Sequence, residues 1–517
     1  MKDPKRLISL LKLTACGLFL VGVFALSVTA QKPSPRIGER PALQEHIQQS
    51  DIESGKLTVD ELLKRGEEIF AARWTTLDGQ GRPAATGNGV PTKRNPANNP
   101  GFIRTSGPDA TSCADCHHQP TIGGAGGFVA NVFVLAQNLD PPTDSVSAEF
   151  SNERNTLGMN GSGAIEMLAR EMSQDLLAIR AAAVAEARSS GKPVTKSLDT
   201  KGVNFGRITA KPDGTVDPSE IEGVDRDLIV KPFHQKGVVA SVRVFTVNAM
   251  NHHHGMQAVE RFGVGQRDSQ GHVITTNDFD EDGVTDELTV GDITAVTLFQ
   301  VAMNIPGRVL PDDLERRAAA ERGEQLFAQI GCTDCHKPAL TLNSRFFTEP
   351  NPFNPPGNLQ PEQVSRPISF DLTRDGPGPR LERTPSGGAL VRAYTDLKRH
   401  IICDDQDPFF CNERLVQGGV PVDQFLTRKL WDVGNTAPYG HRGDLTTITE
   451  AILHHAGEAR PQRERFVALA EEDQAAIIEF LKTLQVLPPG SPPVVTESQL
   501  GERLRTNEPS KRIRSAP

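Results

Sequence analysis

Cys113-Ala114-Asp115-Cys116-His117 and Cys332-Thr333-Asp334-Cys335-His336 repeat one pattern, in which two cysteines are separated by two residues and followed at once by a histidine. Each copy comes after a similar stretch, Arg-Gly-Glu-x-(Ile/Leu)-Phe, at residues 65–70 and 322–327. The second stretch ends five residues before its cysteine, whereas a long insertion of loop composition separates the first stretch from its cysteine. This internal repeat predicts two related domains.

The Cys-x-x-Cys-His pattern is the attachment motif of a c-type haem. Two thiols add to the two vinyl groups of one porphyrin, and the adjacent histidine is then close enough to ligate the iron. With 7 cysteines and 13 histidines in 517 residues, two chance matches have a probability on the order of a few per million. The sequence therefore predicts two covalently bound haems, one on Cys113, Cys116 and His117 and one on Cys332, Cys335 and His336.

Two other uses of paired cysteines fit the sequence less well. A structural zinc site would bring the four cysteines into one tetrahedron and would leave the following histidine unexplained in both copies. A thioredoxin-like redox pair requires a βαβ context, which a helix followed by the motif does not provide.

The N-terminus has the pattern of an export signal. Basic residues precede a mostly apolar stretch at residues 7–30, which ends in small residues that a signal peptidase reads. The charge-free run of about 18 residues leaves an uncleaved membrane anchor as an alternative, and Cys16 ends a stretch that resembles a lipidation site. We expect a periplasmic or otherwise extracytoplasmic protein, which touches a membrane only if this segment is uncleaved or lipidated.

Composition limits the partners and assigns the remaining cysteines. A net charge of −9 without a basic stripe argues against nucleic acid as a partner. Cys403 and Cys411 flank a short acidic segment, and in an exported protein this spacing predicts a disulfide that stabilises by about 2 kcal/mol. A catalytic dithiol is the alternative, although the flanking acids would raise the thiol pKa rather than lower it.

Helical periodicity dominates the rest of the chain, so we predict a mainly α fold of two cytochrome c-like haem domains with long loops and minor β structure. The predicted divisions are a signal peptide at 1–30, a linker at 31–55, an N-terminal haem domain at 56–310, a C-terminal haem domain at 311–490 and a disordered tail at 491–517.

The ligand on the second face of each iron decides what such a protein does. Strong protein ligands on both irons favour electron transfer, whereas an open or exchangeable position lets an iron bind peroxide or dioxygen. Candidate ligands form two clusters, which comprise His252, His253 and His254 within residues 250–256, and His454 with His455. We expect each cluster to face a haem, although any single histidine is as well explained by ordinary hydrogen bonding.

Two acidic features are further candidates. Glu166 lies early in a helical stretch near the first motif, where it could move a proton between peroxide oxygens, or be an ordinary first-turn glutamate. Asp278, Asp280 and Asp282 place carboxylates at alternating positions ahead of a glycine, as in the first half of a calcium loop. Thr289 stands where an EF-hand has its bidentate glutamate, so a solvated acidic turn is the alternative.

The stretch Trp431-Asp432-Val433-Gly434-Asn435-Thr436-Ala437-Pro438-Tyr439-Gly440-His441-Arg442-Gly443-Asp444-Leu445, together with the two motifs and the export signal, resembles the di-haem peroxidase superfamily. That superfamily contains the bacterial di-haem cytochrome c peroxidases and the MauG-type enzymes, and the chain is most similar to its di-haem oxidoreductase family. The similarity runs in order over about residues 60–487.

In that family a Pro-Tyr-x-His-x-Gly segment precedes a helix, and the residue fourteen positions after its histidine ligates the haem of the C-terminal domain. That position here is His455, where the family's peroxidases have methionine. The resemblance therefore implies an iron of lower potential with two histidine ligands. It also places Glu166 near the distal acid of the superfamily's enzymes and strengthens the expectation of calcium at the loop of Asp278.

By this resemblance we expect a peroxidase-type oxidoreductase. One haem would accept electrons from a small redox protein or other donor, and the other would reduce a peroxide or small oxidant. A pure electron-transfer cytochrome with two bis-histidine irons is the first alternative. A MauG-like enzyme that oxidises an organic or protein substrate is a weaker one, since its tyrosine ligand would have to be Tyr394 or Tyr439.

Overall fold

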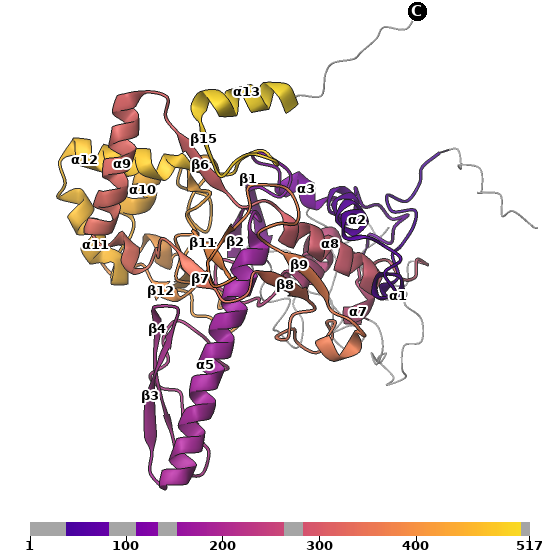
Figure 1. Ribbon diagram of the computed structural model, residues 1–517, viewed down its shortest axis with the longest axis horizontal. Helices are drawn as coiled ribbons and strands as arrows, with labels where there is room; N and C mark the ends of the chain where they lie inside the picture. Colours follow the sequence, from indigo (N-terminus) through magenta and orange to yellow (C-terminus); the bar gives the residue numbers. More distant parts are fainter. Residues whose placement is uncertain (1–37, 82–109, 133–151, 263–282, 508–517) are drawn as a thin grey trace, which may run out of the picture. The chain divides into compact units, whose positions relative to one another are not determined.

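The structure is a computed structural model that describes residues 38–81, 110–132, 152–262 and 283–507 (Figure 1). The export segment and the aspartates Asp278, Asp280 and Asp282 lie outside the described residues. Among the described residues, no helix has the length and apolar character needed to cross a membrane.

The two sequence repeats form equivalent pairs of helices. Helix α2 (Val59–Ala71) packs against α8 (Val290–Ala302), and α9 (Leu314–Gln329) packs against α12 (Glu471–Thr483). Side chains at residues Thr58, Thr289 and Asp313 cap three of these helices by accepting a hydrogen bond from a backbone N–H in the first turn. The motifs follow as short turns, α3 (Cys113–Cys116) and a 3₁₀ turn at Cys332–Asp334.

The repeated glycine explains why both helix pairs are close. A Cβ atom at Gly66 would overlap the backbone carbonyl of Ala295 in α8, and one at Gly323 would overlap that of Ala476 in α12. Only a residue without a side chain lets each pair of backbones come this near. In each repeat the glycine thus allows two helices to cross closely, and the phenylalanine that follows it lies near the motif histidine.

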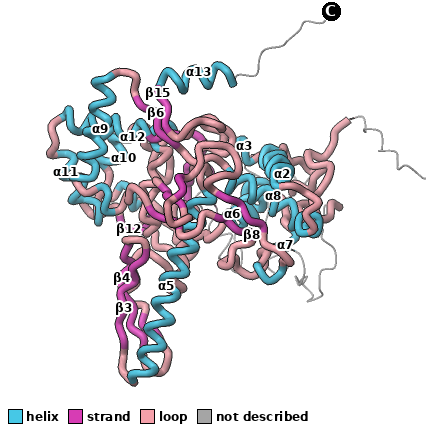
Figure 2. The backbone as a smooth tube through the Cα atoms, in the orientation of Figure 1, coloured by secondary structure: helices cyan, strands magenta, loops and turns pink. Residues whose placement is uncertain are grey.

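Helix α5 (Ser162–Ser190) connects the region of the first motif to a β-hairpin. Its N-terminal half is buried, and its C-terminal half lies beside β3 (Val194–Thr200) and β4 (Val203–Ala210), which pair antiparallel (Figures 1 and 2). The short β5 (Val216–Asp217) extends this sheet. Burial on alternate positions of β4 is the pattern of a sheet with one face against a helix.

The prediction of a mainly α fold is wrong. Of the described residues, 37% are helical and 18% are in strands, and the strands form six small sheets of two or three strands each. The other sheets pair β1 (Gly126–Val132) with β2 (Asn152–Thr156), β6 (Gly307–Leu310) with β14 (Leu484–Gln485) and β15 (Val494–Thr496), β7 (Leu340–Leu342) with β11 (Ala389–Val391) and β10 (Glu382–Arg383), β8 (Phe346–Glu349) with β9 (Ile368–Asp371), and β12 (Arg399–Ile401) with β13 (Gln424–Leu426). Periodicity misses these strands because most have only two to four residues, too few to show alternation.

Two cytochrome c-like domains are likewise not observed, because residues 41–517 form one compact unit. The predicted division at residue 310 falls at the end of β6, whose partners β14 and β15 come from the far C-terminal part of the chain. Among the described residues, the remaining α-helices of this unit are α1 (Gln49–Glu53), α6 (Val242–Ala249), α7 (Val259–Phe262), α10 (Ile448–Leu453), α11 (Arg460–Val467) and α13 (Glu497–Asn507).

Two predicted irregular segments contain regular structure. The predicted linker contains α1, which packs on α8, and its Ile47 N–H donates to the Asp292 carboxylate at 2.9 Å. The predicted disordered tail contains β15 and α13. Polar composition did not reveal that the described parts of these two segments are held in place by backbone pairing and by a buried capping carboxylate.

Candidate functional site

Both Cys-x-x-Cys-His motifs line one cavity of about 430 Å³. Its wall is mainly apolar, with phenylalanines and leucines from α2, α6, α9, β13 and α12. No group of potential metal ligands among the described residues combines cysteines from both motifs, which argues against the zinc alternative. An apolar cavity whose lining includes both motifs suits large flat groups such as porphyrins.

The two motif histidines have the same surroundings. His117 Nδ1 lies 3.3 Å from the Gly124 carbonyl oxygen, and His336 Nδ1 lies 3.0 Å from that of Tyr394. A carbonyl only accepts, so each Nδ1 holds the proton and each Nε2 keeps its lone pair. This second hydrogen bond is the usual way in which a protein orients a histidine that ligates a metal.

Burial keeps both motif histidines neutral, as a ligand must be. It lowers the pKa of His117 and of His336 to about 4. Phe70 lies 6.3 Å from the His117 ring and Phe327 lies 6.3 Å from the His336 ring, at interplanar angles of 52° and 49°. The repeat in the sequence is therefore a repeat in the surroundings of the two motif histidines.

The motif cysteines are thiols that are not paired with one another. Cys113, Cys116, Cys332 and Cys335 are free and partly buried. Burial raises the pKa of Cys113 and of Cys332 to about 12. Neutral thiols on the wall of an apolar cavity suit addition to porphyrin vinyl groups better than coordination of a free cation, which requires thiolates.

His455 lies on the same cavity wall, just after α10. Its Nδ1 is 2.7 Å from the Ala451 carbonyl oxygen, so its Nε2 also keeps a lone pair. The proximity of His455 contributes to lowering the pKa of His336, and burial lowers the pKa of His455 itself. The neighbouring His454 stacks on Phe409 and is absent from the cavity wall.

The structure separates the three consecutive histidines, which form a π-helical turn, Met250–His254, after α6. His253 and His254 line the cavity, whereas His252 is buried away from its wall. His254 Nε2 lies 3.3 Å from Cys113 Sγ, at the attachment edge of the first motif. The charge of His253 contributes to lowering the pKa of His117, and the charge of His117 contributes to lowering the pKa of His254, so both histidines lie near the first motif histidine.

Glu166 is not placed as predicted. It is fully buried, it is not on the cavity wall, and both of its carboxylate oxygens are engaged. Oε1 accepts from Arg170 and from Asn351 Nδ2 at 2.7 Å, and Oε2 accepts from the Val242 N–H at 2.7 Å. A carboxylate so fully bonded, outside the cavity, is not positioned to move a proton at an iron ligand.

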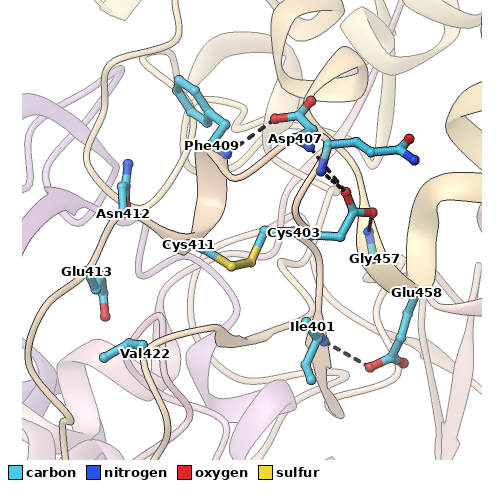
Figure 3. The surroundings of a disulfide bond; sticks show 12 residues. Ile401, Cys403, Asp407, Phe409, Cys411, Asn412, Glu413, Val422, Gly457 and Glu458 are labelled. Carbon is cyan, nitrogen blue, oxygen red and sulfur yellow. Dashed lines mark hydrogen bonds between the residues drawn. A yellow bond between two sulfur atoms is a disulfide. The ribbon is translucent and has the colours of Figure 1, made fainter.

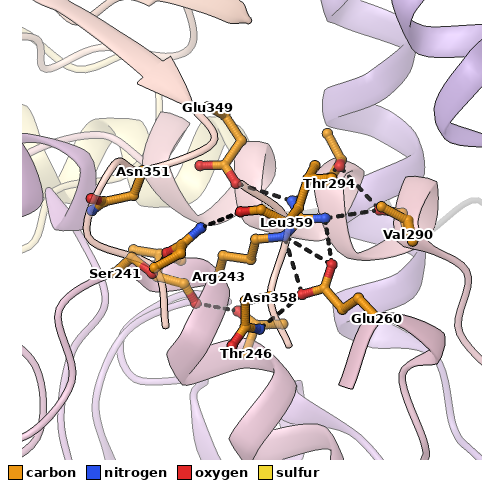
Figure 4. A network of polar contacts seen from close by, with 12 residues as sticks. Ser241, Arg243, Thr246, Glu260, Val290, Thr294, Glu349, Asn351, Asn358 and Leu359 are labelled. Carbon is orange, nitrogen blue, oxygen red and sulfur yellow. Dashed lines mark hydrogen bonds and ion pairs between the residues drawn. The ribbon is translucent and has the colours of Figure 1, made fainter. Parts of the chain in front are cut away.

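Glu166 lies close to a buried charge network around Arg243 (Figure 4), since its charge contributes to raising the pKa of Glu349. Arg243 has no exposed surface and forms ion pairs with Glu260 at 2.7 Å and Glu349 at 3.0 Å. Burial raises the pKa of Glu349 to about 7, although the Arg243 guanidinium opposes that shift. The network joins α6, α7 and β8 beside the cavity.

Cys403 and Cys411 form the disulfide that the sequence predicts, with Cα atoms 5.7 Å apart (Figure 3). The loop between them is anchored by Asp404, which accepts from the Gly457 N–H at 2.9 Å. Phe410 in this loop lies 6.1 Å from the His455 ring and is part of the cavity wall. The disulfide loop thus helps to shape the surroundings of His455.

His400 is a cavity residue that sequence reasoning missed. It lies between the carboxylates of Asp396 at 2.9 Å and Glu458 at 2.7 Å. Burial lowers its pKa, but hydrogen bonds with Asp396, Cys335 and Glu458 outweigh burial and raise the pKa to about 11. A single histidine among polar residues has no motif that would reveal such a pair of partners, one of them 58 residues away.

His400 predicts a pH dependence of stability. The folded protein keeps a proton that the unfolded chain loses near pH 6.5, so the stabilisation is complete below that pH and is lost as pH rises through about 11. We expect the free energy of unfolding, measured in urea from pH 7 to pH 10, to fall by up to about 1.4 kcal/mol per pH unit more in the wild type than in His400→Gln. Parallel profiles for the two proteins would contradict this assignment.

Arg154, His234 and His441 are further cavity residues that the sequence did not single out as functional. Arg154 pairs with Glu413, and His441 Nε2 lies 2.7 Å from Asn412 Oδ1. His441 belongs to the stretch at residues 431–445. Their partners lie up to 263 residues away in sequence, so only the fold brings them together.

Comparison with known proteins agrees with this site. Residues 412–484 match the family model described as "Di-haem oxidoreductase, putative peroxidase". The cytochrome-c peroxidase IdrP1 of Denitromonas iodatirespirans is 25% identical over 185 residues, which cover 34% of this chain and 43% of that protein. The chain therefore matches less than half the length of this relative.

Among solved structures, hydrazine synthase of Kuenenia stuttgartiensis pressurised with xenon has a TM-score of 0.31 at 13% identity, covering 88% of this chain and 99% of that one. A MauG-like protein associated with microbial copper homeostasis has a TM-score of 0.25 at 13% identity, covering 62% and 88%. These scores are too low to support an argument about fold. The match at residues 412–484, which include the stretch around His441 and the candidate ligand His455, confirms the similarity of this chain to the di-haem oxidoreductase family of peroxidase type.

Proposed function

We propose that the protein is an exported di-haem c-type oxidoreductase of peroxidase type. The observation that supports this most is the shared apolar cavity, in which two motif histidines each present an Nε2 oriented by a backbone carbonyl. When bound, the haem of the second motif would accept electrons from a small redox partner, and the haem of the first would reduce a peroxide or similar small oxidant.

Different residues would hold the two haems, and their ligands suggest a different function for each haem. Cys332, Cys335 and His336 would hold the second haem, and His455 would supply its second histidine ligand. Two histidine ligands leave no position for an exogenous molecule, so this site suits electron entry. Cys113, Cys116 and His117 would hold the first haem.

His253 would face the first haem as an exchangeable ligand. It lies in a single π-helical turn, a feature that recurs at functional sites because the local backbone is less regular. Its departure from the iron would open that position to a small oxidant. Calcium at residues 278–282 and a periplasmic location remain part of the proposal.

Electron transfer alone is the second candidate, and the position of His253 favours it if that ligand never leaves the iron. Electron paramagnetic resonance of the oxidised and half-reduced protein separates the two. A high-spin or peroxide-responsive iron together with peroxide turnover supports the peroxidase. Low-spin signals in every redox state without turnover would leave the electron-transfer cytochrome.

The MauG-like alternative has less support, because neither tyrosine is free for an iron. The Tyr394 hydroxyl donates to Glu324 at 3.0 Å and the Tyr439 hydroxyl donates to the Val433 carbonyl at 2.9 Å.

The variant His455→Ala tests the ligand assignment. We expect the low-spin signal of the second haem to become high-spin, because the imidazole that completes its coordination is lost. The matched control is His454→Ala, which removes the adjacent histidine outside the cavity and should leave both haem signals unchanged. An unaltered spectrum of the second haem in His455→Ala would reject His455 as a ligand.

A further inference from the structure

His234 stands in an unusual backbone conformation on the cavity wall. Its φ of 74° lies in the left-handed region, which non-glycine residues rarely occupy. The turn is closed on both sides, since the N–H of Gly237 donates to the His234 carbonyl and Phe233 pairs with Val239. Such local strain persists only where the surroundings impose it, and it is concentrated at functional sites.

A chain of hydrogen bonds determines which ring nitrogen of His234 holds the proton. The Arg154 guanidinium can only donate, and its Nη2 lies 2.7 Å from Gln417 Oε1. The Gln417 amide must therefore turn its Nε2, a donor, toward His234 Nε2, which lies at 3.3 Å. His234 Nε2 thus accepts, and the proton of the neutral ring resides on Nδ1.

That Nδ1–H is a buried donor without a hydrogen-bond partner among the residues that the structure describes. Burial, with the nearby Arg154 charge, lowers the pKa of His234 to about 3, so the ring is neutral and donates from Nδ1 alone. An unsatisfied buried N–H is costly, unless a molecule in the cavity accepts from it. The unsatisfied Nδ1–H of His234 therefore indicates a binding site for a molecule with a hydrogen-bond acceptor.

The acceptor would be at the first haem rather than the second. His253, which is close to His117, is also close enough to His234 to help lower its pKa. Phe245 of α6, the helix that leads into the turn of His253, lies 6.3 Å from the His234 ring. His253, His234 and Arg154 all line the cavity.

We propose that His234 is the hydrogen-bond donor to the small oxygen-bearing molecule that binds the first iron, and that Gln417 and Arg154 are its positioning residues. The assignment rests on the proposed function for the identity of that molecule, a peroxide, but its geometry rests on this network alone. His234 would thus be the polar group beside the bound peroxide, a role that Glu166 cannot have because it lies outside the cavity. Because the donor is a neutral ring in one defined tautomer, reversal of that tautomer abolishes the interaction without removing the ring.

Fluoride binding to the ferric first haem of the loaded protein tests this inference without turnover. Bound fluoride accepts a hydrogen bond as a peroxide oxygen does. We expect His234→Phe to weaken fluoride binding at least about tenfold. Gln417→Glu should weaken it to a similar extent, because a carboxylate accepts from His234 Nε2–H and moves the proton away from Nδ1.

The double variant sharpens the test. If Gln417 acts only through His234, then His234→Phe with Gln417→Glu should bind fluoride no more weakly than His234→Phe alone. His454→Phe, which changes a histidine outside the cavity, is the control and should bind like the wild type. Haem content is measured in every variant so that a loss of cofactor is not mistaken for a loss of affinity.

The outcomes distinguish this inference from the proposed function. Unchanged fluoride affinity in His234→Phe, or a wild-type first haem that binds no fluoride in either the oxidised or the half-reduced protein, overturns the inference. A tenfold loss in both single variants without further loss in the double variant supports it. If the same result is found in a protein that turns over no peroxide, the donor assignment stands and the peroxidase function is rejected.

Discussion

Arg243→Met is expected to lower the free energy of unfolding by about 3–5 kcal/mol, because it leaves two buried carboxylates without their cation. Arg243 is fully buried and donates to Glu260, Glu349 and the Thr294 hydroxyl, which lies at 3.0 Å (Figure 4). Methionine fills much of the space of the side chain but donates no hydrogen bond. Urea unfolding monitored by circular dichroism measures the loss.

The same variant should become more sensitive to pH. The folded-state pKa of Glu349 is already raised to about 7 by burial, and loss of the guanidinium that opposes this shift raises it further. A carboxyl whose folded pKa exceeds its unfolded value stabilises less as pH rises, so the defect should be larger at pH 8 than at pH 5. Arg392→Met, which removes an exposed pair with Glu382, is the control and should cause no measurable change. A similar loss in both variants would contradict the role of the buried network.

Replacing both cysteines of one motif is expected to remove one covalently bound haem. The variants Cys113→Ser/Cys116→Ser and Cys332→Ser/Cys335→Ser should each show one c-type haem per chain in a pyridine haemochrome spectrum, against two in the wild type, because serine forms no thioether. The two variants should differ in the haem that remains, which electron paramagnetic resonance identifies by its ligands.

The third cysteine pair is the matched control. Cys403→Ser/Cys411→Ser changes the same number of cysteines but removes a disulfide instead of an attachment site. We expect it to keep two haems and to be less stable by about 2 kcal/mol, since the disulfide closes a short loop. A motif variant that still holds two haems, or a wild type with fewer than two, would refute the assignment of both motifs.

Part of the candidate site could be predicted from the sequence, because some of its residues belong to short motifs. Two cysteines followed by a histidine can be recognised without knowledge of the fold. The same is true of the Pro-Tyr-x-His-x-Gly segment, from whose histidine the position of His455 is counted. Glu166 shows the opposite case. A glutamate near the start of a helix has the same sequence signature whether it faces a cavity or, as here, an arginine one turn later.

The sequence by itself identified the two Cys-x-x-Cys-His motifs, the paired glycines and phenylalanines of the repeat, and the disulfide, because each depends on residues close together in the chain. Tertiary structure alone decided that both motifs share one cavity, that two of the three consecutive histidines, His253 and His254, reach it, and that the fold mixes helices with small sheets. It also decided the tautomer of His234, through Arg154 and Gln417. The physical reason is that hydrogen-bond direction and burial depend on neighbours far apart in sequence, which periodicity and motif spacing do not specify.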